Sequence, residues 1–213
     1  MLHTETATGE TFELLKTLMQ DKEFTNFYLV GGTALALYLG HRRSIDLDLF
    51  TPFPFDSETV EKYLVEKYNF DSDFRRNNTL KGTINNTKID CITYAYPFVE
   101  DICVSDNIRL YAMKDIAAMK LSAIAGDGSR LKDFIDIACL SVKLSLSDML
   151  EAYQKKFEHC NAISPIKGMT YFDDIIFTEP IVMMKGIYDW KKIQKRLYDM
   201  IKEENTVFQS FPV

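Results

Sequence analysis

The spacing of apolar and polar residues divides the chain into a first part that reads as strands with interspersed helices and a second part that reads as helices. Short runs rich in β-branched and aromatic residues predict strands at 27–30, 45–50, 70–75, 79–84 and 88–94. Apolar residues recurring every three or four positions predict helices at 9–20, 33–39, 57–68, 114–125, 130–144, 147–157 and 189–203. We therefore expect an α+β fold, with a sheet-containing core domain in residues 1–105 and a helical domain in residues 106–213.

Composition restricts the kinds of protein that this chain can be. Hydrophobic residues make up 46% of the 213 residues and charged residues 26%, which is ordinary globular usage. The apolar runs are too short to cross a bilayer and the first residues do not resemble a signal peptide, so we expect a cytoplasmic protein with no membrane partner. Four scattered cysteines and three scattered histidines make a zinc site improbable, so any metal should be a hard cation bound through oxygen.

The segment Ser44–Phe50 carries the strongest chemical signal. On a strand, alternate side chains share a face, so Asp46 and Asp48 should lie together while Ile45, Leu47 and Leu49 face the core. Two neighbouring carboxylates repel each other and favour a counter-cation such as Mg²⁺ or Mn²⁺.

A second acidic strand adds a third carboxylate. In the run Thr87–Tyr94, Lys88, Asp90 and Ile92 share one face, and Asp90 would join the first two acids if the strands are neighbours. Three carboxylates suit a pair of divalent cations, with Asp90 as a candidate base. The alternative is that these acids mark the solvent face of an antiparallel sheet.

A glycine turn precedes the acidic strand. After the strand at 27–30 come Gly31, Gly32 and Thr33, and a helix starts at once. Glycines let a phosphate approach the backbone, the N–H groups at a helix start attract anions, and Thr33 adds a hydroxyl. The combination predicts a triphosphate cradle beside the metal site.

Charged residues in the second part of the chain add to the candidate site. Lys120 sits among Ile116, Met119, Ala123 and Ile124, the predicted buried stripe of its helix, so it must reach solvent, pair with an acid or meet a phosphate. In the next helix Arg130, Asp133 and Asp136 form one ridge, which could equally be a solvated face. Arg42 and Arg43, directly before the acidic strand, are candidates for binding a triphosphate or an RNA acceptor.

The run from Gly31 to Phe50 resembles the signature of the nucleotidyltransferase superfamily, a glycine turn followed by Asp-x-Asp. In detail it is similar to the AbiEii/AbiGii toxin group, with further resemblance at 88–93 and 110–140. Thr33 is a departure, because many members of the superfamily have serine there.

The resemblance implies a mixed-sheet core followed by a helical part, with Gly31, Gly32 and Thr33 at the triphosphate. It implies that Asp46, Asp48 and Asp90 bind metal, that Lys120 contacts phosphate, and that Asp133 and Asp136 jointly support the site. The expected reaction is transfer of NMP from an NTP to an acceptor such as RNA or tRNA by a toxin-like enzyme that an antitoxin restrains. The alternatives are a phosphotransferase that moves the γ-phosphate and a non-catalytic nucleotide-binding module.

Overall fold

The computed structural model describes residues 1–213, and a single mixed sheet of seven strands forms its centre. The strand order is β3-β4-β5-β2-β1-β7-β6. Pairs β2/β5 and β1/β7 are parallel and the other four pairs are antiparallel. The strands are β1 (Tyr28–Val30), β2 (Leu47–Thr51), β3 (Asp71–Arg76), β4 (Thr79–Ile84), β5 (Thr87–Thr93), β6 (Cys103–Ser105) and β7 (Ile108–Leu110).

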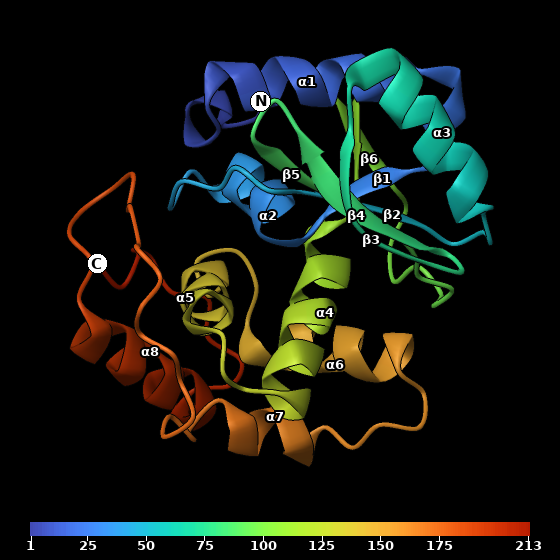
Figure 1. Cartoon of the computed structure of the whole chain (residues 1–213). Helices are drawn as coiled ribbons and strands as arrows, with labels where there is room; N and C mark the ends of the chain where they lie inside the picture. The colour runs from blue at the N-terminus through green and yellow to red at the C-terminus, as the bar shows by residue number, and fades with distance from the viewer.

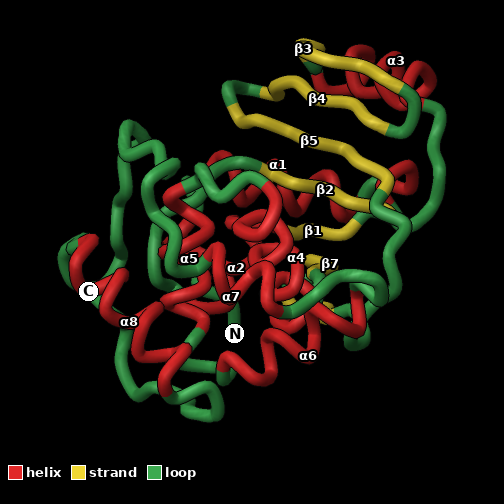
Figure 2. The backbone as a smooth tube through the Cα atoms, turned by 90° about the horizontal axis from the view of Figure 1, so that it is seen from below, coloured by secondary structure: helices red, strands yellow, loops and turns green.

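Helices cover both faces of the sheet. In Figure 1, α1 (Gly9–Gln20) and α3 (Ser57–Tyr68) lie above the sheet and α4 (Met113–Gly126) lies below it with the later helices. Figure 2 shows β3 and α3 at the edge of the sheet far from α8. The remaining helices are α2 (Gly31–Leu39), α5 (Leu131–Leu140), α6 (Leu146–Lys156), α7 (Ile163–Gly168) and α8 (Trp190–Lys202). No helix is both long enough and apolar enough to cross a membrane.

The α+β fold with helices toward the C-terminus is confirmed, and most predicted elements lie within two or three residues of their expected bounds. Asp56 caps α3, and Asn85 and Asn86, both with positive φ, form the turn between β4 and β5. Three short elements, β6, β7 and α7, were not predicted. The division at residue 105 stays a prediction, and β7 lies beyond it yet pairs with β1.

One apolar core joins the two predicted parts of the chain. It is a continuous cluster of 47 buried residues that extends from Leu2 to Met200. Helix α2 contacts both α4 and α5, so the glycine turn at its start is held against the helical part of the chain. The packing therefore fixes the position of the candidate site relative to both parts.

The segment between α7 and α8, which we call the strap (residues 171–189), returns to the first part of the chain. Its Ile176 N–H donates to the carbonyl of Ser129, at 2.9 Å. Farther along, the Arg43 N–H donates to Val182 and the Met184 N–H donates to His41, at 2.8 and 2.9 Å. The strap thus links the start of α5 to the loop that leads into β2.

Candidate active site

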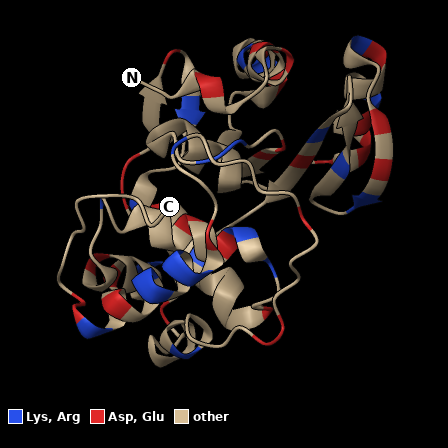
Figure 3. Ribbon diagram, turned by 90° about the vertical axis from the view of Figure 1, so that its left-hand side faces the viewer, with Lys and Arg blue, Asp and Glu red and all other residues tan.

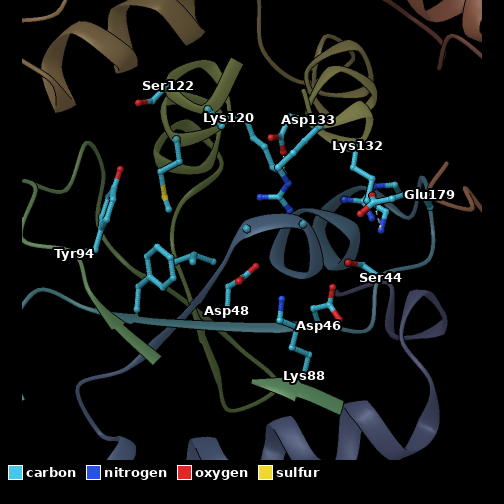
Figure 4. Close-up of a pocket in the computed structure, with 18 residues that line it drawn as sticks. Ser44, Asp46, Asp48, Lys88, Tyr94, Lys120, Ser122, Lys132, Asp133 and Glu179 are labelled. Atoms are coloured by element: carbon cyan, nitrogen blue, oxygen red, sulfur yellow. Dashed lines mark hydrogen bonds and ion pairs between the residues drawn. The ribbon is translucent and has the colours of Figure 1, made fainter. Parts of the chain in front are cut away.

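Most of the predicted site residues line one cleft of about 410 Å³ between the sheet and helices α4 and α5, but Thr33, Arg43, Asp90 and Asp136 do not line it. Val30, Gly31 and Gly32 line it from the turn between β1 and α2. The other lining residues that matter here are Arg42, Ser44, Asp46, Asp48, Phe50, Lys88, Tyr94, Met119, Lys120, Ser122, Ala123, Arg130, Lys132, Asp133 and Glu179. Figure 4 shows Asp48 pointing from β2 into the cleft, with Lys120 and Asp133 on the opposite wall.

The strands that carry Asp48 and Asp90 are neighbours, as the sequence analysis expected. β2 and β5 run parallel with Asp48 directly opposite Asp90, so both side chains lie on the same face of the sheet. Asp90 is only 7% exposed, which rules out the interpretation that it marks a solvent face. The partial burial of Asp48 raises the pKa of its carboxyl, and the charge of Asp90 raises it further against the opposing effects of Lys120 and Arg130.

Asp90 has one oxygen paired and one free. Lys81, its partner across β4, holds Oδ2 of Asp90 at 2.7 Å. Oδ1 of Asp90 is buried and has no hydrogen-bond partner. An unpaired buried oxygen is costly, so this atom is one that a ligand could satisfy, although Asp90 itself does not line the cleft.

Asp46 lies just before β2 and is exposed, although it lines the same cleft. No three acidic, histidine or cysteine side chains stand close enough together to hold a metal ion as they are placed here. Asp90 is instead paired with Lys81 of β4. The prediction for Ile45 is wrong: this side chain is 44% exposed, because the strand begins only at Leu47.

The glycine turn has the geometry that a phosphate cradle needs. Gly31 has a φ of +69°, and a Cβ at this position would collide with Oδ2 of Asp48. A Cβ on Gly32 would press against the guanidinium of Arg42. Both glycines line the cleft, and the absence of side chains lets the carboxylate of Asp48 and the guanidinium of Arg42 lie directly against the backbone at the start of α2.

Thr33 does not offer its hydroxyl to the cleft. The side chain is 1% exposed, donates to the backbone carbonyl of Asp46 and lies 2.9 Å from the hydroxyl of Ser44. Thr33 therefore fixes the loop that carries Asp46, and it is Ser44 that lines the cleft. The expectation that Thr33 itself meets the triphosphate does not agree with this geometry.

A buried network of charges supports the wall formed by α4 and α5. Lys120 is 7% exposed and pairs with Asp133 at 2.5 Å and Asp136 at 2.8 Å, so of the three possibilities for this lysine it is the acid pair that is found. Arg42 binds both oxygens of Asp136, at 2.7 and 2.8 Å, and His41 lies 2.9 Å from the same carboxylate. Both acids are buried, so the ridge is not a solvated face.

The charges in this network shift one another's pKa values. Burial alone would lower the pKa of Lys120, but the carboxylates of Asp136 and Asp133 raise it, so the lysine stays charged. Burial opposes ionisation of Asp136, yet Arg42 and Lys120 hold its pKa well below the ordinary value. Asp133 lines the cleft whereas Asp136 lies behind it, so Asp133 is the acid nearer to a bound ligand and Asp136 positions its neighbours.

Arg42 and Arg43 lie in different environments. Arg42 is 2% exposed and paired with Asp136, so it is not free to capture a ligand from solvent. Its guanidinium nevertheless borders the cleft. Arg43 is exposed and lies outside the cleft. The sequence analysis missed Ser44, Lys132 and Glu179, and it assigned no role to Phe50 or Tyr94. The alternation that placed Asp48 and Asp90 also places these two aromatic residues on the site face.

Comparisons with known proteins identify the family and agree with the fold. The model of the family described as nucleotidyl transferase AbiEii toxin, Type IV TA system, matches residues 13–107 and 93–208. An uncharacterised protein of Aquifex aeolicus (strain VF5) is 33% identical over 155 residues, which cover 70% of this chain and 75% of that protein. Among solved structures, the fold is similar to MenT4, a nucleotidyltransferase toxin of Mycobacterium tuberculosis H37Rv, with a TM-score of 0.55, 13% identity and coverage of 90% and 84% of the two chains. JHP933 of Helicobacter pylori gives a TM-score of 0.53 at 16% identity, with 93% of each chain covered.

Proposed function

Because the chain belongs to the family of AbiEii nucleotidyl transferase toxins, and is therefore a nucleotidyltransferase, we propose that it transfers NMP from an NTP to RNA with the help of a divalent cation. The observation that carries the proposal is that Asp48 and Asp90 lie side by side on neighbouring strands, with the backbone of Gly31 directly against Asp48. It combines a place for a hard cation with a place for phosphate.

The carboxylate oxygens in and beside the cleft are of the kind that Mg²⁺ or Mn²⁺ binds. Asp48 and Asp90 offer carboxylate oxygens on one face, Oδ1 of Asp90 is buried without a partner, and Asp46 lines the same cleft. Hard divalent cations favour such oxygens. A bound cation would neutralise charge on the triphosphate and promote ionisation of the attacking hydroxyl.

Residues of the chain itself bind the phosphates, stabilise the leaving group and accept the proton. Backbone N–H groups of Gly31 and Gly32 face the β- and γ-phosphates, and Lys120 stabilises the negative charge that grows as pyrophosphate leaves. The acceptor oxygen forms a bond to the α-phosphorus while the bond from that phosphorus to the bridging oxygen breaks. Pyrophosphate departs with the electron pair of the broken bond, and the proton of the acceptor hydroxyl passes to Asp90, which we assign as the base.

An RNA acceptor and an antitoxin belong to the same proposal. Five cationic side chains and four acidic ones line the cleft, although the whole chain has a net charge of −6. A polyanion can therefore approach the cleft despite the acidic protein around it. The family description, a toxin of a toxin–antitoxin system, supports a cellular role in which expression arrests growth unless an antitoxin is present.

Labelled nucleotides test the reaction directly. The protein is incubated with total RNA, Mg²⁺ and each NTP labelled at the α-phosphate, and again with NTPs labelled at the γ-phosphate. We expect label in RNA from at least one α-labelled NTP, loss of that label with a chelator, and at least a hundredfold loss in Asp48→Asn. Label from the γ-phosphate alone would instead show a phosphotransferase. Metal-dependent binding of NTP without transfer of either label to RNA or protein would show a nucleotide-binding module.

A further inference from the structure

We propose that the apolar end of the cleft is the binding slot for the nucleobase of the NTP, formed by Phe50 and Tyr94 on the sheet and by Met119, Ser122 and Ala123 on α4. This inference rests on the proposed function, because it assigns one part of the same cleft to one part of the nucleotide. It also gives a role to residues that the sequence pattern placed in the core or left unassigned.

The cleft has two chemically different ends. In Figure 4, Lys132, Glu179 and Ser44 lie at one end, Tyr94 and Ser122 lie at the other, and Asp48 stands between them. The charged end suits phosphates, since it also contains the backbone of Gly32. The other end suits a flat, weakly polar group, because ligand slots of this kind combine apolar walls with a few polar groups.

Strand geometry explains how the aromatic end arises. Phe50 follows Asp48 by two residues in β2 and therefore lies on the same face, about 7 Å farther along the strand. Phe50 pairs with Ile92 of β5, and Tyr94 is two residues beyond Ile92, so it returns to that face. The rings of Phe50 and Tyr94 lie 5.4 Å apart and tilted by 43°. A ribose can span the distance from an α-phosphate at Asp48 to a base on these rings.

The wall opposite is made by α4. Met119 and Ala123 were expected in the buried stripe of this helix, but both are half-buried and line the cleft, whereas Ile116 and Ile124 are in the core. A methionine side chain and a small alanine leave a space that a planar ring can enter, and thioether sulfur packs well against π-systems. In Figure 4 the hydroxyl of Tyr94 points toward α4, with Ser122 on the helix above it. These two hydroxyls are the groups available to contact the edge of the base.

Tyr94 is held in place from behind. The ammonium of Lys156 lies 5.6 Å from the centre of its ring and is fixed by Asp115 at 2.7 Å and by the carbonyl of Pro97 at 2.9 Å. Lys156 and Asp115 are fully buried, so this support is rigid. A stacking surface that is already ordered loses little entropy when a base binds.

The experiment compares the binding of Mg²⁺–NTP with that of Mg²⁺–tripolyphosphate, which has the charge but no base, by calorimetry without RNA. Ala123→Phe fills the slot without removing any packing, and Ala125→Phe, on the same helix but outside this cleft, is its matched control. We expect Ala123→Phe to weaken NTP binding at least tenfold and to change tripolyphosphate binding less than twofold, while Ala125→Phe changes neither. Phe50→Ala should also weaken NTP binding selectively, because stacking on an aromatic ring is lost.

Each other outcome overturns the proposal in a recognisable way. If Ala123→Phe weakens the binding of both ligands equally, the slot does not hold the base. If NTP binding is unchanged and only the labelling of RNA is lost, the slot holds a base of the acceptor instead. If the wild-type protein binds neither ligand, the proposed function itself fails, whereas tight binding of both with no preference for NTP contradicts only the slot.

Discussion

Asp48 shows how a functional side chain can destabilise the protein that carries it. Its carboxyl lies opposite Asp90 and has a raised pKa, because burial and the charge of Asp90 outweigh the favourable charges of Lys120 and Arg130, so ionising it at neutral pH costs folding free energy. The sign follows from proton linkage: between the ordinary pKa of 3.8 and the raised value the folded state binds more protons, so this contribution to stability falls as the pH rises.

We therefore expect Asp48→Asn to make the metal-free protein more stable at pH 7, by about 1 kcal/mol or roughly 2–4 °C in Tm. Millimolar Mg²⁺ with NTP should raise the Tm of the wild type and leave that of Asp48→Asn unchanged. Thermal unfolding followed by circular dichroism measures both effects. A variant that is less stable than the wild type without metal would show that Asp48 is satisfied within the protein.

Asp136, unlike Asp48, is a buried carboxylate whose charge stabilises the folded protein. It is fully buried and binds Arg42 and Lys120, so replacing it leaves two buried cations with one carboxylate. We expect Asp136→Asn to lower the free energy of unfolding by about 3–5 kcal/mol in urea titrations. Asp199→Asn, which breaks an ion pair to Lys195 on the surface of α8, is the control and should cost less than about 0.5 kcal/mol. Equal losses would mean that the buried network is not what holds α5 to the loop before β2.

At the scale of elements, one carboxylate clamps two helices together. Asp21 follows the last residue of α1 and accepts hydrogen bonds from Tyr63, Lys67 and Tyr68 of α3, at distances of 2.5–2.8 Å. Burial works against the ionised form of Asp21, but these three donors lower its pKa from 3.8 to about 2.

Because the folded pKa of Asp21 is depressed, its contribution to stability is present above about pH 4 and disappears as the pH falls to about 2. Asp21→Asn should therefore reduce the free energy of unfolding by about 2 kcal/mol at pH 7. The difference from the wild type should shrink toward zero in urea titrations at pH 2. A difference that does not depend on pH would show that the side chain acts through packing rather than through its charge.

The elements that the sequence predicted well are those whose patterns are local. The helix at α3 was predicted at 57–68 because its apolar spacing is contained within those residues. β6 and β7 have three residues each, too few for an alternation to show, and they form only because β7 pairs with the distant β1. The site was found where it depends on alternation and missed where it depends on tertiary contact. The buried pairing of Arg42 with Asp136 joins positions 94 residues apart and leaves no signal in the sequence.

At the scale of the whole molecule, the distribution of charge bears on how a polyanion such as RNA could approach the cleft. Figure 3 shows basic and acidic residues interspersed over the ribbon, and the net charge is −6. Because a net negative protein repels RNA, the proposed RNA acceptor would have to be bound through local cations near the cleft. Arg43 is the exposed cation next to the loop that carries Asp46.

We expect Arg43→Ala to weaken RNA binding about three- to tenfold at low salt and to reduce the slope of log affinity against log salt by about 1. Lys62→Ala, an exposed lysine of α3 paired only with Glu58, should leave the slope unchanged. Filter binding at several salt concentrations measures the slope. If both variants behave alike, RNA does not pass over the loop before β2.

The shared core also determines how the molecule unfolds. Since one cluster of 47 residues runs through both predicted parts, residues 1–105 alone would expose the faces of α2 that pack on α4 and α5. We expect that fragment to lack a cooperative thermal transition and the full chain to unfold in a single one, as calorimetry can test. Two separate transitions in the full chain would show instead that the division at residue 105 marks independent domains.

The position of the strap near the end of the chain determines when, during translation, the cleft can be completed. Glu179, which comes from the strap, lines the cleft together with residues of the first strands, and its partner Lys132 lies 3.2 Å away on α5. A ribosome must therefore add residues beyond 179 before the cleft has all its walls. Half-made chains would contain the acidic strands and the glycine turn without a complete site.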